Sequence, residues 1–421
     1  MKSKFSVQTY VGIVLLSLSG AAIYLLPYLR WSYYDALMEA SGLNNTQFGV
    51  TMSVFGVLAM IFYPVGGLAA DRFSAKKLLS IAVIGSGILG VWYSTFPSYM
   101  AQVVIYAGWG VLSTLTFWAA MMKATRQLGS SDEQGRLFGL VEGGRGVLST
   151  IVSFAALFAF SKMGEGLGGL KGIIVAMSVV NIVTGILIFF FLKEGQREDV
   201  KEEGQKKLQL SDIVRILKMP AIWLISLIII CCYSVYLGST YLTPYFTNVI
   251  GATASFAALL SIMRTYVLQF LGAPTGGMLA DKIGSITKVI NGCYVVMIAA
   301  LVLIILLPST KGAMIPLIIV LLALCGGIFA MRGIYFATID EVDIPIHVTG
   351  TAVGIVSIIG FMPDVFISAL CGKFLDVFEG AAGYRAIFIM MLAFAVVGLI
   401  STMLLLKLNK RGRANERTEN K

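Results

Sequence analysis

Apolar residues occur in long blocks along the chain, and polar residues collect between the blocks. Each block is about 20 residues long, which is the length a helix needs to cross about 30 Å of hydrocarbon. We therefore predict an all-α membrane protein with twelve transmembrane helices in two related six-helix bundles. The predicted helices are 10–29, 46–69, 78–95, 99–122, 137–160, 172–192, 220–243, 254–280, 287–307, 314–338, 348–372 and 384–407.

Most connections between these blocks are short, so consecutive helices are expected to be antiparallel. The exception is a long, charged stretch after the sixth helix, which contains no apolar block. It predicts a linker that separates six helices from six. The predicted parts are an N-terminal bundle at 1–192, a cytoplasmic linker at 193–219, a C-terminal bundle at 220–407 and a basic cytoplasmic tail at 408–421.

Composition and charge agree with a membrane protein. Hydrophobic residues make up 57% and charged residues 13%, whereas a soluble domain has about 45–50% and about 25%. Most Lys and Arg fall on one side of the predicted helices, which places both termini in the cytoplasm of a bacterial inner membrane. The net charge of +10 is thus attributed to topology and anionic lipid, not to nucleic acid. The loop with Asp340, Glu341 and Asp343 breaks the pattern.

Motifs for metals, cofactors and catalysis are absent from the sequence. The five cysteines lie in apolar segments without CxxC spacing, and His347 is the single histidine. No Walker sequence and no nucleophile–base set occurs. We therefore predict no cofactor, no metal site and no enzymatic activity.

A short motif recurs almost half the chain length later. Pro64-Val-Gly-Gly-Leu-Ala-Ala-Asp-Arg ends the second predicted helix, and Pro274-Thr-Gly-Gly-Met-Leu-Ala-Asp-Lys ends the eighth. Both copies resemble the loop 2–3 signature of the major facilitator superfamily, although Ser74 replaces a usual glycine. The resemblance implies a secondary transporter in which the glycines allow close helix packing and the Asp holds one conformation. The matching residues are Gly67, Asp71, Arg72, Gly277, Asp281 and Lys282.

Other parts of the chain depart from known branches of that superfamily. Drug/proton antiporters carry an Arg in helix 4 and Gly-Pro in helix 5, and both are missing here, which disfavours a multidrug antiporter. The run from Gln134 to Gly146 resembles the YihN-like branch of bacterial inner-membrane proteins.

Charged residues within the predicted helices are candidates for function, because each costs about 2.5–3.5 kcal/mol at mid-bilayer. Counting along the helices places Arg264 and Asp364 at a similar depth, so they are expected to pair. Such a pair is either a substrate or proton-coupling site, or a static salt bridge. Anion exchangers of the oxalate–formate type also place a cation on helix 8.

The remaining intramembrane charges have two interpretations each. Glu142 and Arg145 lie one turn apart and are expected to pair, as a cytoplasmic gate or as a packing bridge. Arg30 follows the aromatic face of Tyr24, Tyr28 and Trp31 and resembles the helix 1 arginine of organophosphate:phosphate antiporters. The matching helix 7 arginine is missing, with Tyr236 near its place. Arg30 alternatively snorkels at the outer interface.

These residues lead to a functional prediction. The intramembrane arginines outnumber the acids, which favours a small organic anion carried by alternating access with proton coupling or exchange. The alternatives are a neutral sugar or nucleoside carrier, bound through the hydroxyls of helix 7, and a non-transporting membrane sensor. The expected partners are the substrate, a proton or counter-substrate and the lipid bilayer, with a monomer as the functional unit. Predicted substrate residues are Arg264, Arg30, Arg332, Tyr233, Tyr236 and Tyr28, and predicted coupling or gating residues are Asp364, Glu142 and Arg145.

Overall fold

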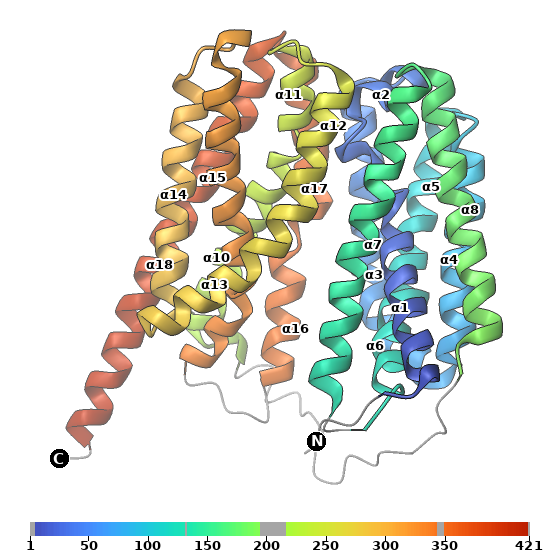
Figure 1. Ribbon diagram of the computed structural model, residues 1–421. Helices are drawn as coiled ribbons and strands as arrows, with labels where there is room; N and C mark the ends of the chain where they lie inside the picture. Colours follow the sequence, from blue (N-terminus) through green and yellow to red (C-terminus); the bar gives the residue numbers. More distant parts are fainter. Residues whose placement is uncertain (1–4, 131–132, 194–215, 343–348, 420–421) are drawn as a thin grey trace. The chain divides into compact units, whose positions relative to one another are not determined.

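The computed structural model describes residues 5–130, 133–193, 216–342 and 349–419, which are almost entirely helical (Figure 1). Twelve helical spans within these residues are long and apolar enough to cross a membrane, which confirms the predicted number. Asp343, His347 and most of the predicted linker lie outside the described residues. The spans are Val7–Leu25, Asn45–Arg72, Ala75–Tyr93, Tyr99–Arg126, Arg136–Lys162, Leu167–Phe191, Pro220–Asn248, Ala254–Ile283, Ile286–Leu306, Lys311–Arg332, Ala352–Val377 and Ala381–Asn409.

The chain divides into two compact units. The first comprises Met1–Asp199 with Ala252–Ile262 and Ser368–Asp376, and the second comprises Val200–Gly251, Met263–Ile367 and Val377–Lys421. The predicted boundaries at 193–219 stay a prediction. Helices of the first unit are α1 (Val7–Leu25), η1 (Leu29–Trp31), α2 (Tyr34–Ser41), α3 (Asn45–Arg72), α4 (Ala75–Tyr93), α5 (Tyr99–Val111), η2 (Leu112–Trp118), α6 (Ala119–Arg126), α7 (Gln134–Lys162), α8 (Leu167–Phe191) and α12 (Ala254–Ile262).

The second unit contains several interrupted spans. The seventh span breaks between α10 and α11, and the eleventh breaks between α16 and α17, where Pro363 cannot donate a helical hydrogen bond. The remaining helices are α10 (Pro220–Ser239), α11 (Leu242–Asn248), η4 (Met263–Val267), α13 (Leu268–Ile283), α14 (Ile286–Leu306), η5 (Lys311–Ala313), α15 (Met314–Arg332), η6 (Tyr335–Glu341), α16 (Thr349–Gly360), α17 (Pro363–Val377) and α18 (Ala381–Glu419).

Two spans contain a π-helical segment, η2 in the fourth span and η4 in the eighth. A π-segment widens the helix and is frequently found at functional sites. Arg264 lies in η4. The π-segment of the eighth span therefore coincides with one of the candidate charged residues.

Close helix packing at the duplicated motif depends on the first glycine of each pair. A Cβ atom on Gly66 would lie 2.2 Å from the carbonyl oxygen of Thr114, and one on Gly276 would lie 2.1 Å from that of Ala330. A Cβ atom on Gly67 or Gly277 would have no neighbour within 4 Å. The assignment of close packing to Gly67 and Gly277 is thus wrong, because these two glycines face away from the neighbouring helix.

The acidic loop after the tenth span has a local structural role. Glu341 accepts hydrogen bonds from the backbone N–H groups of Ile286 (2.6 Å) and Thr287 (3.0 Å), in the first turn of α14. An anion is favoured there because helical N–H groups lack partners and the helix dipole is positive. Burial alone raises the pKa of Glu341, but the bonds from Thr287 and Ile286 outweigh it and hold the pKa below its ordinary value.

A second carboxylate caps a helix within the first unit. Asp376 of α17 accepts from the backbone N–H groups of Asn45 (3.1 Å) and Thr46 (2.7 Å), and from both of their side chains. The free N-terminus of α3 is thereby closed from outside the helix. Since Asp376 follows α3 by more than 300 residues, this contact fixes the end of the eleventh span to the first unit.

Candidate functional site

In the second unit a carboxylate and a phenol meet at a helix break. Asp364 lies in the first turn of α17, and Tyr233 lies on α10. The Tyr233 hydroxyl is 2.9 and 3.1 Å from the two carboxylate oxygens, so it donates to the carboxylate. The ring of Phe361 packs edge-on against Tyr233, with ring centroids 4.9 Å apart. The broken span therefore presents an acidic group that is held by a single side-chain donor among the described residues.

A cation completes this cluster. Arg332, the last residue of α15, stacks its guanidinium over the ring of Tyr236 at 3.9 Å and lies 5.6 Å from the ring of Tyr233. Such cation–π contacts contribute about 0.5–2 kcal/mol. Its Nη1 atom is buried and has no hydrogen-bond partner in the described part of the chain. The cluster of Asp364, Tyr233, Tyr236 and Arg332, here called the C-terminal polar cluster, thus combines both charges with aromatic faces.

The predicted pair of Arg264 and Asp364 is wrong. Arg264 is only 3% exposed, and its Nη1 donates to the hydroxyl of Ser239 at 3.1 Å. That hydroxyl donates in turn to the carbonyl of Tyr236 at 2.6 Å. Asp364 instead accepts from Tyr233. Counting residues along a helix predicts the depth of a side chain in the membrane. It does not predict the direction in which the side chain points.

The first unit holds the predicted ion pair on α7. Arg145 and Glu142 lie 2.7 Å apart, and Arg145 also lies 5.9 Å from the ring of Trp118 at the end of η2. The local pairing is therefore confirmed. Whether the pair acts as a gate or as a packing bridge stays a prediction.

The aromatic face at the end of α1 forms a continuous stack. Tyr24 and Tyr28 are nearly parallel with centroids 5.5 Å apart, and Tyr28 and Trp31 are nearly parallel at 4.0 Å. All three side chains are half-buried. The set of Tyr24, Tyr28 and Trp31 is called the aromatic ladder below. Flat, partly accessible rings of this kind provide a surface for a planar or sugar ring.

Arg30 points away from this ladder. Its side chain is 3% exposed, its Nη1 donates to the carbonyl of Phe48 at 2.6 Å, and its guanidinium lies 3.8 Å from the Phe48 ring. A second bond of 3.2 Å reaches Thr51. The snorkelling interpretation is wrong, because the guanidinium is buried against Phe48 of α3. Direct contact of Arg30 with the substrate stays a prediction.

The acidic residues of the duplicated motif lie at the surface. Asp71 and Asp281 are exposed, as are Arg72 and Lys282. Within the described residues no hydrogen bond or ion pair to either carboxylate is found. The expected role of the Asp in holding one conformation therefore stays a prediction. The contact seen at this helix end comes from Lys123, whose ammonium donates to the carbonyl of Ala70.

Sequence reasoning missed several residues that shape the site. Phe361 and Phe329 pack edge-on against Tyr233 and Tyr236, and Ser239 links Arg264 to α10. The available signal for Phe361 was its position two residues before Pro363, since proline disfavours a continuous helix. No comparable signal marks Phe329 or Ser239.

Comparison with known proteins concerns the family and the fold. A model of the Major Facilitator Superfamily matches residues 11–367. The inner membrane protein YihN of Escherichia coli (strain K12) is 34% identical over 398 residues, covering 93% of this chain and 94% of that protein. The hexuronate transporter of Bacillus subtilis (strain 168) is 24% identical over 254 residues, or 57% of each protein.

A solved structure shares the fold. The crystal structure of the nucleoside transporter NupG matches with a TM-score of 0.70 and 14% identity, covering 95% of this chain and 98% of that one. At this identity the likeness concerns the fold alone. The E. coli relative supports a multi-pass protein of the inner membrane. Twelve spans, the duplicated motif and these matches show that the chain is a transporter rather than an enzyme, and that it belongs to the major facilitator superfamily.

Proposed function

We propose that the protein is a secondary active transporter of a small organic anion, working by alternating access. The observation that carries this proposal is the C-terminal polar cluster, above all the guanidinium of Arg332 with its unbonded Nη1. A desolvated guanidinium without a full set of acceptors is costly, and a carboxylate or phosphate matches its geometry. A bound anion would supply the missing acceptor.

The other intramembrane arginines are less suited to this role, although Arg30 also has a buried Nη2 atom without a hydrogen-bond partner among the described residues. Arg145 is paired with Glu142, and Arg30 is enclosed by Phe48. Arg332 is half-buried, in contrast to the 3% exposure of Arg30 and Arg264. The matched hexuronate transporter is named for a sugar acid, a substrate that combines a carboxylate with hydroxyl groups. We favour this chemical class because the cluster offers both a guanidinium and two phenols.

Coupling is assigned to Asp364. A carboxylate at a helix break that is held by one phenol donor can release or bind a proton without dismantling a salt bridge. Protonation would weaken its attraction to the nearby Arg332 and leave that cation for the substrate. Proton symport and exchange of anions both follow from this arrangement.

A neutral sugar or nucleoside is the second candidate. The aromatic ladder favours it, because stacked and partly accessible rings bind flat apolar faces without needing charge. In that case Arg332 would serve to orient Tyr236 and would not contact the ligand.

Thermal-shift measurement of the purified protein separates these candidates. Sugar acids and other organic acids should raise the melting temperature of the wild type, whereas neutral sugars and nucleosides should not. R332Q should lose this response, and R332K should retain part of it because it keeps the charge without the fork geometry. Stabilisation of both the wild type and R332Q by neutral sugars alone would contradict the anion proposal.

A further inference from the structure

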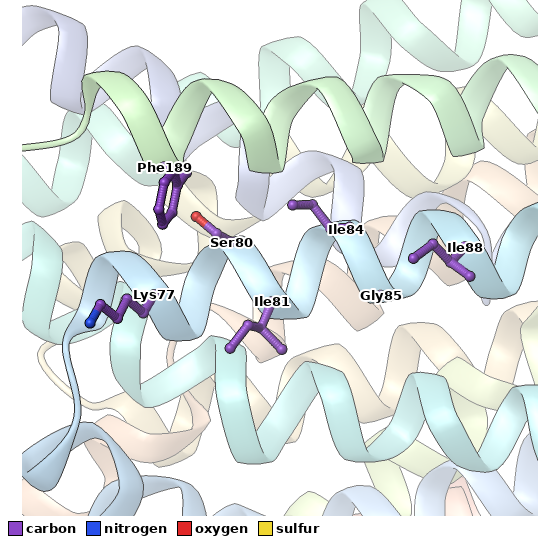
Figure 2. A pocket seen from close by; sticks show the side chains of 7 residues that line it. All are labelled: Lys77, Ser80, Ile81, Ile84, Gly85, Ile88 and Phe189. Carbon is purple, nitrogen blue, oxygen red and sulfur yellow. The ribbon is translucent and has the colours of Figure 1, made fainter.

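A groove runs along the outer surface of α4 beside the end of α8. Its volume is about 480 Å³, and its lining is apolar except at one end. Figure 2 shows Ile81, Ile84 and Ile88 spaced along α4, with Phe189 of α8 beside Ser80 and Lys77 at the end where α4 begins. The groove lies within the first unit and contains none of the residues of the polar cluster or the ladder.

Small residues form the floor of this groove. Ser80 and Gly85 interrupt the row of isoleucines on α4. On α8, a Cβ atom at Gly185 would lie 3.1 Å from the carbonyl oxygen of Ser80, so the two helices approach each other closely below the groove. The side chains of Ile81, Ile88 and Phe189 are 57%, 58% and 47% exposed. A channel with small residues at its floor and bulky apolar walls fits a single hydrocarbon chain.

The length of the groove matches one leaflet. Lys77 and Ile88 are separated by eleven residues along α4, or about 16 Å at about 1.5 Å per residue. Half of the hydrocarbon thickness of a bilayer is about 15 Å. A chain that entered beside Lys77 would therefore end near the bilayer midplane at Ile88.

The polar end of the groove is basic. Lys77 is exposed, and no hydrogen bond or ion pair of its ammonium is found within the described residues. Lys76 lies next to it, with its ammonium 5.6 Å from the ring of Phe189. Basic pockets between membrane helices attract anionic lipid headgroups, and each surface Lys contributes about 1 kcal/mol. A zwitterionic headgroup would place a second cation against these lysines.

We propose that this groove is a binding site for an anionic phospholipid, with one acyl chain between α4 and α8 and the phosphate against Lys76 and Lys77. The site is independent of the transport substrate. The proposed ligand is a specifically bound lipid with a negative charge, in contrast to the bulk lipid that surrounds every membrane protein.

Native mass spectrometry of the full-length protein in detergent tests the proposal, with equimolar phosphatidylglycerol and phosphatidylcholine added. The wild type should retain phosphatidylglycerol at least several-fold over phosphatidylcholine. K76Q/K77Q should lose this preference. I81A/I88A should retain less phosphatidylglycerol with both lysines intact, because it removes two exposed apolar walls of the groove.

The matched control is K288Q, which removes a lysine from the first turns of α14 in the second unit and should leave the preference unchanged. Glycerol phosphate at the same concentration should not displace the lipid, since the free headgroup has no chain for the groove. Equal retention of both lipids by the wild type, or wild-type retention of phosphatidylglycerol in both K76Q/K77Q and I81A/I88A, would overturn the proposal. Displacement by glycerol phosphate would also overturn it, in favour of a simple anion site.

Discussion

The hydroxyl of Tyr233 bridges both carboxylate oxygens of Asp364, at 3.1 and 2.9 Å, across the break between α16 and α17. Tyr233 in turn lies next to Arg332, so the phenol stands between the acid and the cation. Asp364 and Arg332 are both close to Tyr233, so a change of contacts among these three side chains needs no movement of the backbone. In the proposed mechanism, a proton on Asp364 weakens the attraction of the carboxyl group to Arg332 and so couples protonation to transport.

Removal of that hydroxyl should alter the pH dependence of uptake. Y233F deletes a hydrogen bond to a charged group, which contributes about 1.5–3 kcal/mol, or about one to two pH units at about 1.4 kcal/mol per unit. The bond favours the ionised carboxylate, so the pH profile of uptake in proteoliposomes should move to higher pH. Y245F is the control, because the Tyr245 hydroxyl contacts Ser309 and not an acid. An unchanged profile in Y233F would remove Tyr233 from the coupling mechanism.

The first glycine of each duplicated pair should be intolerant of alanine. In G66A and G276A the new methyl group meets a backbone carbonyl, which cannot rotate away, so the helices have to separate. Overpacking of this kind costs about 1–3 kcal/mol. We expect a lower melting temperature for both variants and wild-type values for G67A and G277A. Equal melting temperatures in G66A and G67A would show that α3 and η2 separate without cost.

Stability should depend on the ionisation of Glu341 in acid. Because the folded pKa is lowered, the capping bonds add stability at a pH above the ordinary carboxyl value, and this stability is lost as the pH falls through the folded pKa. E341Q should lower the melting temperature at pH 7, by the roughly 1 kcal/mol typical of a helix cap. Its deficit should shrink below about pH 4. E379Q, on an exposed carboxylate, should show neither effect, and a deficit in E341Q that is constant with pH would contradict the capping role.

Thiol labelling should establish the orientation. S130C, in the exposed connection before α7, should react in intact cells only with membrane-permeant maleimide, and G168C, at the start of α8, should also react with the impermeant reagent. The five native cysteines are free and buried, so the wild-type chain is a suitable background. Reaction of S130C with the impermeant reagent would place both termini on the outer side.

The sequence was sufficient to predict the membrane-spanning helices, but it did not predict the direction in which their side chains point. Apolar block length determines where a helix crosses the membrane, so the predicted bounds agree with the structure to within a few residues at most ends. Local pairs such as Glu142 and Arg145 also follow from helical spacing. Long-range pairs depend on how each helix is rotated about its axis. For this reason Arg264 was expected to bind Asp364 but binds Ser239.

The sequence also did not predict the irregular helical segments. The π-segment that contains Arg264 has no proline or glycine within it that would have indicated an irregular helix. The break at Pro363 was not predicted within the helix 348–372, nor was the contact that Asp364 makes with Tyr233 there. The two glycines of each motif are chemically identical, so only the packing of α3 against η2 distinguishes Gly66 from Gly67.

The aromatic ladder also gives the molecule an optical reporter. Trp31 lies 4.0 Å from the nearly parallel ring of Tyr28 and is half-buried, whereas Trp109 is 1% exposed and donates its indole N–H to the carbonyl of Ser86. A solute that settles on the ladder changes the polarity around one indole and leaves the enclosed one unaffected. Because the sequence has five tryptophans and Trp92 and Trp223 are also exposed, a variant that keeps Trp31 as its single tryptophan would report binding by intrinsic fluorescence, without an attached dye.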